Sequence, residues 1–477
     1  MNIKQINEVK YIIEKEGNMN ANIVIFSNNK LLENIKRDRT LNQIINASTL
    51  PNIIGNLLLM PDAHEGYGFP VGGVLASPVE DGIVSPGICG FDINCGVRVI
   101  KTNLTYDEIK PKLKTIISEL FKAVPSGVGS KIKIGLTEHD IKNIGEEGVN
   151  YIIDKGIGIK EDIDYIEENG SMKGANIEKV SQEAIKRGID ELGTIGAGNH
   201  FLELQRVEKI YDDNIAKEYG LFENQVLIML HTGSRGFGHQ IASDYIKRIS
   251  DYNKKNNIKL VDPELGYAHI SNHIAIDYLE AMKAAVNYAF TNREIITHNI
   301  RKVFERVFNK SFDELGLFIL YDVAHNIIKE EEHIIENKRV KVFVHRKGAT
   351  RAFPKGRIEL PKAYRDIGQP VLIPGSMGTS SYILSGMPQS LTESLGSTCH
   401  GAGRVMSRHQ AVREIPPNKT LSTMREKGIE IMVKSKNLIS EEAEWAYKDV
   451  DEVVSIVEKA GISKIISKNK PIGVMKG

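Results

Sequence analysis

The chain has 477 residues, 41% of them hydrophobic and 26% charged, which is an ordinary globular balance that can bury a large core. Its 62 lysines and arginines nearly cancel its 61 aspartates and glutamates, so net charge does not indicate nucleic-acid binding, which would need a local basic patch. Three cysteines are too few for a disulfide framework. The sequence also lacks a run of about 18 apolar residues, which a membrane helix would need. Because the N-terminus also lacks an apolar signal stretch, we expect a cytoplasmic protein without a membrane partner.

Glycine-rich loops alternate with regular elements in the first part of the chain. The charged segment 138–190 predicts a helical excursion on the surface, and a β-like run at 225–230 leads into a glycine-rich loop. Residues 274–307 have the apolar periodicity of a long helix. Glycine gathers in six islands, at residues 66–73, 82–96, 193–198, 233–238, 375–378 and 396–403.

Three further β-like runs, at 317–321, 340–344 and 369–373, each precede a loop with polar residues. Residues 441–460 predict a helix with Ser440 as its N-cap. Strands that end in polar loops, without a repeating βαβ pattern, indicate the α+β class. Since no Pro/Ser-rich linker divides the chain, we expect one domain over 1–477, with the helical excursion around 138–190 on its surface.

Asp92 and Cys95 lie three residues apart in a glycine-rich stretch. Their carboxylate and thiol could bind one metal ion if the backbone turns, and Gly90 and Gly96 permit such a turn. The alternative is a core cysteine beside a turn aspartate.

Five of the 13 histidines stand next to glycine-rich or strand-end patterns: His200, His231, His325, His345 and His400. A single histidine at a strand end is usually a hydrogen-bonded structural residue, but five together favour a metal site. Thiolate, imidazole and carboxylate ligands suit Zn, Mn, Fe or Co. Two cations would favour phosphoryl chemistry, because they can bind both the attacking and the leaving oxygen.

Two loops have the composition of phosphate or RNA contacts. Residues 374–381 offer many backbone N–H groups and hydroxyls, although the chain has no P-loop motif. Residues 345–357 hold five basic side chains, and we expect Arg346 and Arg351 to contact RNA phosphates and Phe353 to stack on a base. An ordinary solvated loop is the alternative for each. Asp62 and His64 could contact the substrate or could hydrogen-bond to a metal ligand without binding the metal. The alternative is that they form a capped turn.

Seven segments together resemble the RtcB family of RNA ligases: FDINCGVR, GAGNHFLE, HTGSRGFGHQ, DVAHN, VHRKGATRAF, PGSMGTSSY and GSTCHGAGRVMSR. The resemblance runs from about residue 60 to the C-terminus. It implies one RtcB-type domain, with mixed and antiparallel sheets around a central metal cleft and helices at the flanks. It also implies the joining of RNA 3′-phosphate or 2′,3′-cyclic phosphate ends to 5′-hydroxyl ends, with GTP and Mn²⁺, in tRNA splicing or RNA repair.

The resemblance assigns roles to individual residues. His400 resembles the nucleophile that forms a covalent guanylate, and Cys95 resembles a ligand that bridges two Mn²⁺ ions. Tyr447 and Lys476 stand where the family has a stacking aromatic and a guanine contact. The implied metal ligands are Asp92, Cys95, His200, His231 and His325. The implied guanylate pocket comprises Asn199, His200, Phe201, Leu202, Glu203, His325, Asn326, Pro374, Gly375, Ser376, Met377, Ser381, His400, Gly401, Ala402, Gly403, Tyr447 and Lys476.

One departure from the family pattern is visible near the metal loop. Ile88 replaces a glycine, which restricts the backbone, and Cys89 adds a second thiol that we expect to be buried and structural, with metal binding as the alternative. RNA ends and GTP are the implied partners, an archease-type activating protein is a candidate, and a monomer is the default expectation.

Two other functions compete with an RNA ligase. A binuclear metal-dependent phosphoesterase acting on RNA ends would need the same metal ligands but no nucleotide pocket. A non-catalytic RNA-binding descendant of the enzyme would have lost a ligand or the nucleophile, and this chain retains all six of those residues.

Overall fold

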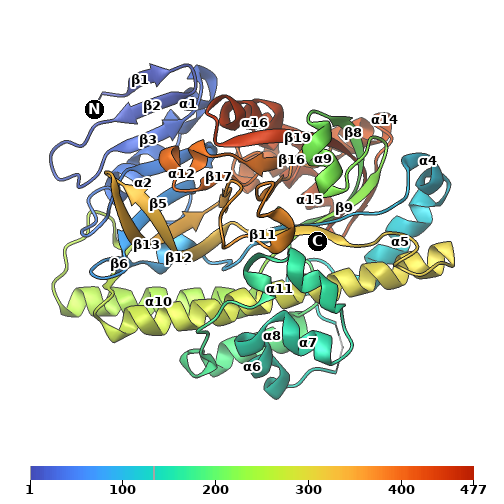
Figure 1. The fold of residues 1–477 in the computed structure, drawn as a ribbon, viewed down its shortest axis with the longest axis horizontal. Helices are drawn as coiled ribbons and strands as arrows, with labels where there is room; N and C mark the ends of the chain where they lie inside the picture. The colour runs from blue at the N-terminus through green and yellow to red at the C-terminus, as the bar shows by residue number, and fades with distance from the viewer. Residues whose placement is uncertain (1, 133–134) are drawn as a thin grey trace.

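A seven-stranded sheet forms one half of the molecule (Figure 1). The computed structural model describes residues 2–132 and 135–477. All neighbouring strands of this sheet are antiparallel except β3 and β4, which run parallel. In spatial order its strands are β1 (Lys4–Asn7), β2 (Lys10–Ile13), β3 (Ile23–Phe26), β4 (Leu57–His64), β5 (Val71–Pro78), β13 (Lys338–Lys347) and β12 (Asn326–Ile335).

A second, eight-stranded sheet forms the other half. Its main path is antiparallel, and β18 (Glu430–Val433) pairs in parallel with β19. Along the path lie β11 (Ile319–Ala324), β7 (Gly96–Ile100), β9 (Val226–Thr232), β8 (Phe201–Ile210), β19 (Ser463–Lys476), β16 (Ser381–Gly386) and β15 (Pro370–Ile373). Two small ribbons complete the strands: β6 (Ile83–Val84) with β10 (Ala268–His269), and β14 (Ala349–Arg351) with β17 (Ser397–Cys399).

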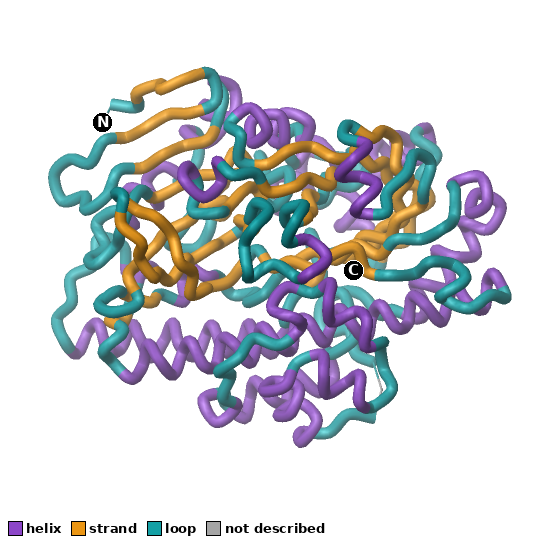
Figure 2. Tube along the Cα trace, viewed as in Figure 1, coloured by secondary structure: helices purple, strands orange, loops and turns teal. Residues whose placement is uncertain are grey.

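Long helices run along one side of both sheets (Figures 1 and 2). The longest, α11 (His273–Phe308), confirms the helix expected at 274–307; Asn272 caps its start by accepting from the Ile274 N–H. Beside it runs α10 (Arg235–Lys255), and α6 (Glu138–Glu147), α7 (Val149–Asp154) and α8 (Gln182–Glu191) pack against these two. The segment 138–190 is therefore helical, as expected.

The remaining helices are short. They are α1 (Asn29–Lys36), α2 (Thr40–Ala47), α3 (Pro86–Cys89), α4 (Tyr106–Ile109), α5 (Leu113–Ala123), α9 (Asp213–Tyr219), α12 (Gln389–Glu393), α13 (Arg408–Glu414), α14 (Pro417–Glu426), α15 (Lys436–Glu441) and α16 (Val450–Lys459). No helix among the described residues has both the length and the apolar composition needed to cross a membrane.

The α+β class is confirmed, and the four expected strands appear as β9, β11, β13 and β15 with shifted ends. The single helix expected at 441–460 is wrong. α15 ends at Glu441, a 3₁₀ turn spans Glu444–Ala446, and α16 begins at Val450 with Asp449 as its N-cap. The irregular stretch between the two helices carries side chains of the cavity described below.

Candidate metal and nucleotide site

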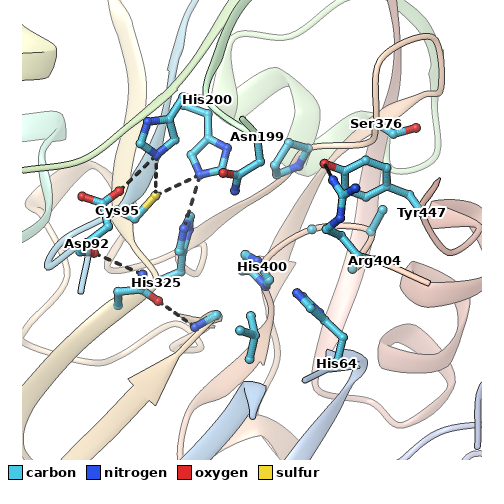
Figure 3. Close-up of a pocket in the computed structure, with 18 of the residues that line it drawn as sticks. His64, Asp92, Cys95, Asn199, His200, His325, Ser376, His400, Arg404 and Tyr447 are labelled. Carbon is cyan, nitrogen blue, oxygen red and sulfur yellow. Dashed lines mark hydrogen bonds and ion pairs between the residues drawn. The ribbon is translucent and has the colours of Figure 1, made fainter. Parts of the chain in front are cut away.

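A cavity of about 260 Å³ lies where the two sheets meet. The chain leaves the second sheet at the end of β11, passes through His325 and enters the first sheet as β12. Residues at other strand ends line the same space: His231 near the end of β9, Lys476 at the end of β19 and His400 directly after β17. Residues far apart in the sequence therefore share one cavity (Figure 3).

Five side chains form a contiguous set of metal-ligand atoms in this cavity. Cys95 Sγ lies 3.2 Å from Nε2 of both His200 and His231, and these three ligand atoms all lie within 4.8 Å of one another. His231 Nε2 is 3.3 Å from His325 Nε2, and His200 Nε2 is 3.0 Å from Asp92 Oδ2. All five residues that the sequence nominated as metal ligands thus lie together.

Burial controls the protonation of this set. Removal from water raises the pKa of the Cys95 thiol well above its usual value, and the nearby Asp92 carboxylate raises it further. Burial also lowers the pKa of His231 and of His325 well below the usual value, and neighbouring histidines lower it further. Without a cation these shifts favour a neutral Cys95 thiol and neutral imidazoles at His231 and His325, whereas a bound cation would stabilise the thiolate.

The chemistry of the donor set fits a transition metal. Among the described residues, the buried Asp92 Oδ2 has no hydrogen-bond partner, although His200 is close. A buried carboxylate oxygen without a partner is costly, and a metal ion would satisfy it. Thiolate and imidazole are soft and intermediate ligands, which favour Mn, Fe, Co or Zn over Mg.

A buried arginine of α11 fixes the backbone around the metal ligands. Arg293 donates to the carbonyls of Asn94 and Thr232, which adjoin Cys95 and His231, and its guanidinium is paired with Asp322 at 2.8 Å. One side chain therefore connects the metal loop to β9 and to β11. Gly233 is needed beside this loop, because a Cβ there would overlap the Asp92 carboxylate.

His400 lies in the same cavity, next to His325, and is held by Asp62. Its Nδ1 lies 2.6 Å from Asp62 Oδ2, and that oxygen also accepts from the N–H groups of His400 and Gly401. Burial alone would raise the pKa of Asp62, but His400 lowers it below its usual value. Because Nδ1 faces the carboxylate, Nε2 is the nitrogen left for chemistry; the ring centroid lies 4.8 Å from that of His325.

The structure divides the expected guanylate-pocket residues into two groups. Most line the cavity, namely Asn199, His200, Phe201, His325, Asn326, Pro374, Gly375, Ser376, His400, Gly401, Ala402, Gly403, Tyr447 and Lys476. Glu203, Met377 and Ser381 are buried behind its wall, where Gln205 Nε2 donates to both Glu203 and Ser381. Ser381 Oγ in turn accepts from the Gly375 N–H.

The expected contact from Leu202 is wrong for its side chain. Alternate residues of a strand face opposite sides, so Phe201 and Glu203 share one face of β8 and Leu202 points to the other. Leu202 is fully buried in the apolar cluster between the second sheet, α5 and α11.

A charged group that the sequence did not reveal supports Tyr447 and Lys476. Glu442 accepts from the Tyr447 hydroxyl and, at 3.0 Å, from Lys476 Nζ, and Arg404 lies 3.1 Å from its other oxygen. Although burial opposes ionisation, Lys476 and Arg404 lower the pKa of Glu442 to about 2. The sequence placed Glu442 in the first turn of a surface helix, so nothing marked it as buried.

The RNA contacts expected from Arg346, Arg351 and Phe353 are wrong. Arg346 and Arg351 are buried in ion pairs, with Glu331 at 2.6 Å and Glu167 at 3.1 Å respectively, and Phe353 is also fully buried. The segment looks basic in sequence because the acidic partners of its buried arginines, Glu331 and Glu167, lie outside it. The cationic side chains that do line the cavity are Lys347, Arg404, Arg408 and Lys476.

Cys89 is buried, as expected for a structural thiol, and it contributes no ligand atom to the cluster formed by Cys95, His200 and His231. Burial raises the pKa of the Cys89 thiol to about 12. Ile88 is fully buried in the apolar cluster beside β4 and β5, so its side chain packs away from the cavity.

Comparison with known proteins agrees with this set of residues. A family model described as "tRNA-splicing ligase RtcB" matches residues 43–477. A protein of that name from Thermococcus kodakarensis is 47% identical over 476 residues, covering 100% of this chain and 99% of the relative. The protein of that name from Pyrobaculum aerophilum is 50% identical over 456 residues, covering 95% of this chain and 94% of the relative. The one from Nanoarchaeum equitans is 48% identical over 480 residues, covering 100% of both chains.

Proposed function

Because the chain belongs to the RtcB family of tRNA-splicing ligases, we propose that it is an RNA ligase that joins 3′-phosphate or 2′,3′-cyclic phosphate ends to 5′-hydroxyl ends through a guanylate carried on His400. GTP is the proposed co-substrate and two Mn²⁺ ions are the proposed cofactors. The observation that carries the proposal is His400, oriented by Asp62 and placed in one cavity with the metal-ligand set. A phosphoesterase would need that set but not a histidine held in this way.

Asp92, Cys95, His200, His231 and His325 would hold the metal ions. When bound, the cations supply positive charge to phosphoryl oxygens and so stabilise the transition state. The support for this assignment is the donor chemistry, together with the buried Asp92 oxygen that otherwise lacks a partner.

His400 acts as the nucleophile in this proposal. With Nδ1 held by Asp62, Nε2 attacks the α-phosphorus of GTP; a P–N bond forms and pyrophosphate leaves. Asp62 fixes the orientation of the ring and stabilises the positive charge that develops on it. An oxygen of the RNA 3′-phosphate then takes the guanylate, the 5′-hydroxyl attacks the activated phosphorus, and GMP leaves. A cyclic phosphate must first be opened by water.

The other wall of the cavity would bind the nucleotide. Tyr447 offers an aromatic face and Lys476 a donor for guanine, and Glu442 holds both side chains in place. The backbone of 374–376 and 401–403 lines the same space. The N–H groups of Gly375, Ser376 and Gly401 already donate to Ser381, Thr379 and Asp62, so Ala402 and Gly403 are the proposed backbone donors to phosphate oxygens. We propose that residues 1–477 work as one catalytic domain, since the residues that line the cavity run from His64 to Lys476. A cytoplasmic location, a monomeric state and an archease-type activator stay predictions.

Labelling with α-phosphate-labelled GTP and Mn²⁺ tests the proposal. The wild type should become labelled and should join an RNA ending in 3′-phosphate to one beginning with 5′-hydroxyl. His400→Ala should lose label and product while its metal content stays normal. Label retained in this variant would exclude His400 as nucleophile, and phosphate release without GTP would favour the phosphoesterase.

A further inference from the structure

Three aromatic rings form a cluster that begins at the metal cavity and leads away from it. Phe91 lines the cavity and directly precedes Asp92. Its ring is stacked on that of His239, with centroids 5.1 Å apart and planes at 24°, and it meets Tyr67 edge-on at 5.2 Å. Tyr67 follows β4 and His239 lies in the second turn of α10, so three separate elements contribute the rings.

This ring cluster remains partly open to solvent, unlike the aromatic residues next to it in sequence. Phe69 and Phe237 are fully buried, whereas Tyr67 and Phe91 are half-buried and His239 is exposed. A ring that served only to pack the metal loop would be expected inside the core. His239 remains exposed while it is stacked on Phe91, which leaves ring surface for another flat group.

A nucleobase is the flat group that this position favours. Single-stranded RNA ends are held by stacking of their bases on aromatic side chains, and such stacking tolerates any base. Because Phe91 and Asp92 are adjacent residues, a base on the cluster would bring the attached backbone to the metal ligands. Lys347 lines the same cavity and donates to the carbonyls of Tyr67 and Gly87, which holds the segment that carries Tyr67 beside the metal loop.

We propose that Tyr67, Phe91 and His239 form a stacking platform for a base close to the RNA end that reacts in the cavity. This assignment rests on the proposed function, because it supposes that the substrate is an RNA end. It adds a base-binding subsite that needs no particular sequence.

Abasic nucleotides provide the test. Each of the three nucleotides nearest the 3′-phosphate, and each of the three nearest the 5′-hydroxyl, is replaced in turn, and single-turnover joining is measured. With the wild type, one position should lose roughly tenfold in joining efficiency, the effect of one base–aromatic stack. His239→Ala and Phe91→Leu should lose a similar factor with normal RNA and show no further loss with the abasic RNA. Phe91→Tyr should restore the discrimination.

Matched measurements separate a stacking role from a structural one. Phe222→Leu removes a ring that is 40% exposed elsewhere on the surface and should keep the wild-type abasic pattern. Guanylate labelling and metal content need no RNA and should persist in His239→Ala. If Phe91→Leu loses metal, the abasic series with His239→Ala decides whether the rings stack on a base, because His239 is not next to a metal ligand in the sequence.

Two outcomes overturn the platform while leaving the ligase intact: no abasic position matters to the wild type, or the penalty is unchanged in His239→Ala. Failure of the wild type to form guanylate or joined RNA would instead overturn the proposed function. In that case the same abasic series is read by fluorescence anisotropy of labelled RNA, and equal affinities would overturn the platform as well.

Discussion

The metal side and the nucleotide side of the cavity are built differently. The metal ligands stand at strand ends and in one short loop, and the fully buried Arg293 joins their backbones. The nucleotide side comes from loops 374–381 and 400–404 and from the irregular stretch 442–449. Its outer contacts, such as Lys427 with Glu444, are partly exposed.

The difference concerns what each side must do. Metal ligands have to be held in place before the ion arrives, so buried charge and strand ends are suitable supports. A nucleotide must enter and leave, and weaker surface contacts allow the walls to move. We therefore expect substitutions on the metal side to affect stability and activity together, and those at the outer edge of the nucleotide side to affect mainly GTP binding.

Arg293→Met should have the largest effect. It removes the donor to two backbone carbonyls and one partner of Asp322, which keeps Arg98 at 2.7 Å; breaking a buried pair of this kind costs up to about 3–5 kcal/mol. Chemical unfolding should show this loss, and metal content should fall with it. Arg306→Met on the same helix is the control, because its ion pair with Glu119 is exposed and worth less than about 1 kcal/mol. Equal losses of unfolding free energy in Arg293→Met and Arg306→Met would contradict the claim that the buried ion pair stabilises the protein more than the exposed one.

Asp62→Asn tests the link between the two sides. The amide keeps the size of the carboxylate but removes the charge that orients His400, so guanylate labelling should slow by roughly 10²–10⁴-fold. The unfolding midpoint and the metal content should change far less, because the metal ligands are untouched. Quench-flow labelling measures the rate, and a loss of less than threefold would exclude Asp62 as the group that positions His400.

Glu203 predicts a pH dependence of stability. Burial raises its pKa to about 7 from 4.5, so the folded state binds this proton more tightly than the unfolded state. The resulting stability is complete below about pH 4.5 and is lost as pH rises through 7, by about 3 kcal/mol at about 1.4 kcal/mol per pKa unit. Glu203→Gln should remove that loss. Unfolding free energies of both proteins at pH 5 and pH 8 give the difference, with Glu208→Gln on the same strand as the control.

The residues of the metal side could be nominated from the sequence because their chemistry is concentrated in a few residue types, and all five line one cavity. Their role as metal ligands stays a prediction. Cysteine, aspartate and histidine beside glycine are uncommon combinations, and the strand-end histidines share a cavity because strands of one sheet end near one another. Resemblance to a family then separated His400 from the ligands, which the spacing of histidines alone did not do.

The sequence failed where the partner of a side chain comes from a distant segment. Arg351 was expected at an RNA surface, but Glu167 from the helical excursion pairs with it inside the protein. Glu442 lies in a stretch whose apolar periodicity predicted one continuous helix, but it stands in the break at 442–449, where it pairs with Arg404 and Lys476. Tertiary ion pairs of this kind leave no local pattern to read.

Lys427→Gln, at the outer edge of the nucleotide side, should have the smallest effect on stability of these variants. Lys427 pairs with Glu444 and donates to the Gly378 carbonyl at 3.0 Å, so it connects α14 to the loop 374–381. Since its side chain is 40% exposed, the unfolding free energy should fall by less than about 1 kcal/mol. The loop should nevertheless be held less firmly, which raises KM for GTP a few-fold with little change in the rate of RNA joining from guanylated enzyme. Steady-state kinetics with varied GTP measure the first quantity and single-turnover joining the second. A loss of stability as large as that of Arg293→Met would show that the nucleotide side is no more adjustable than the metal side.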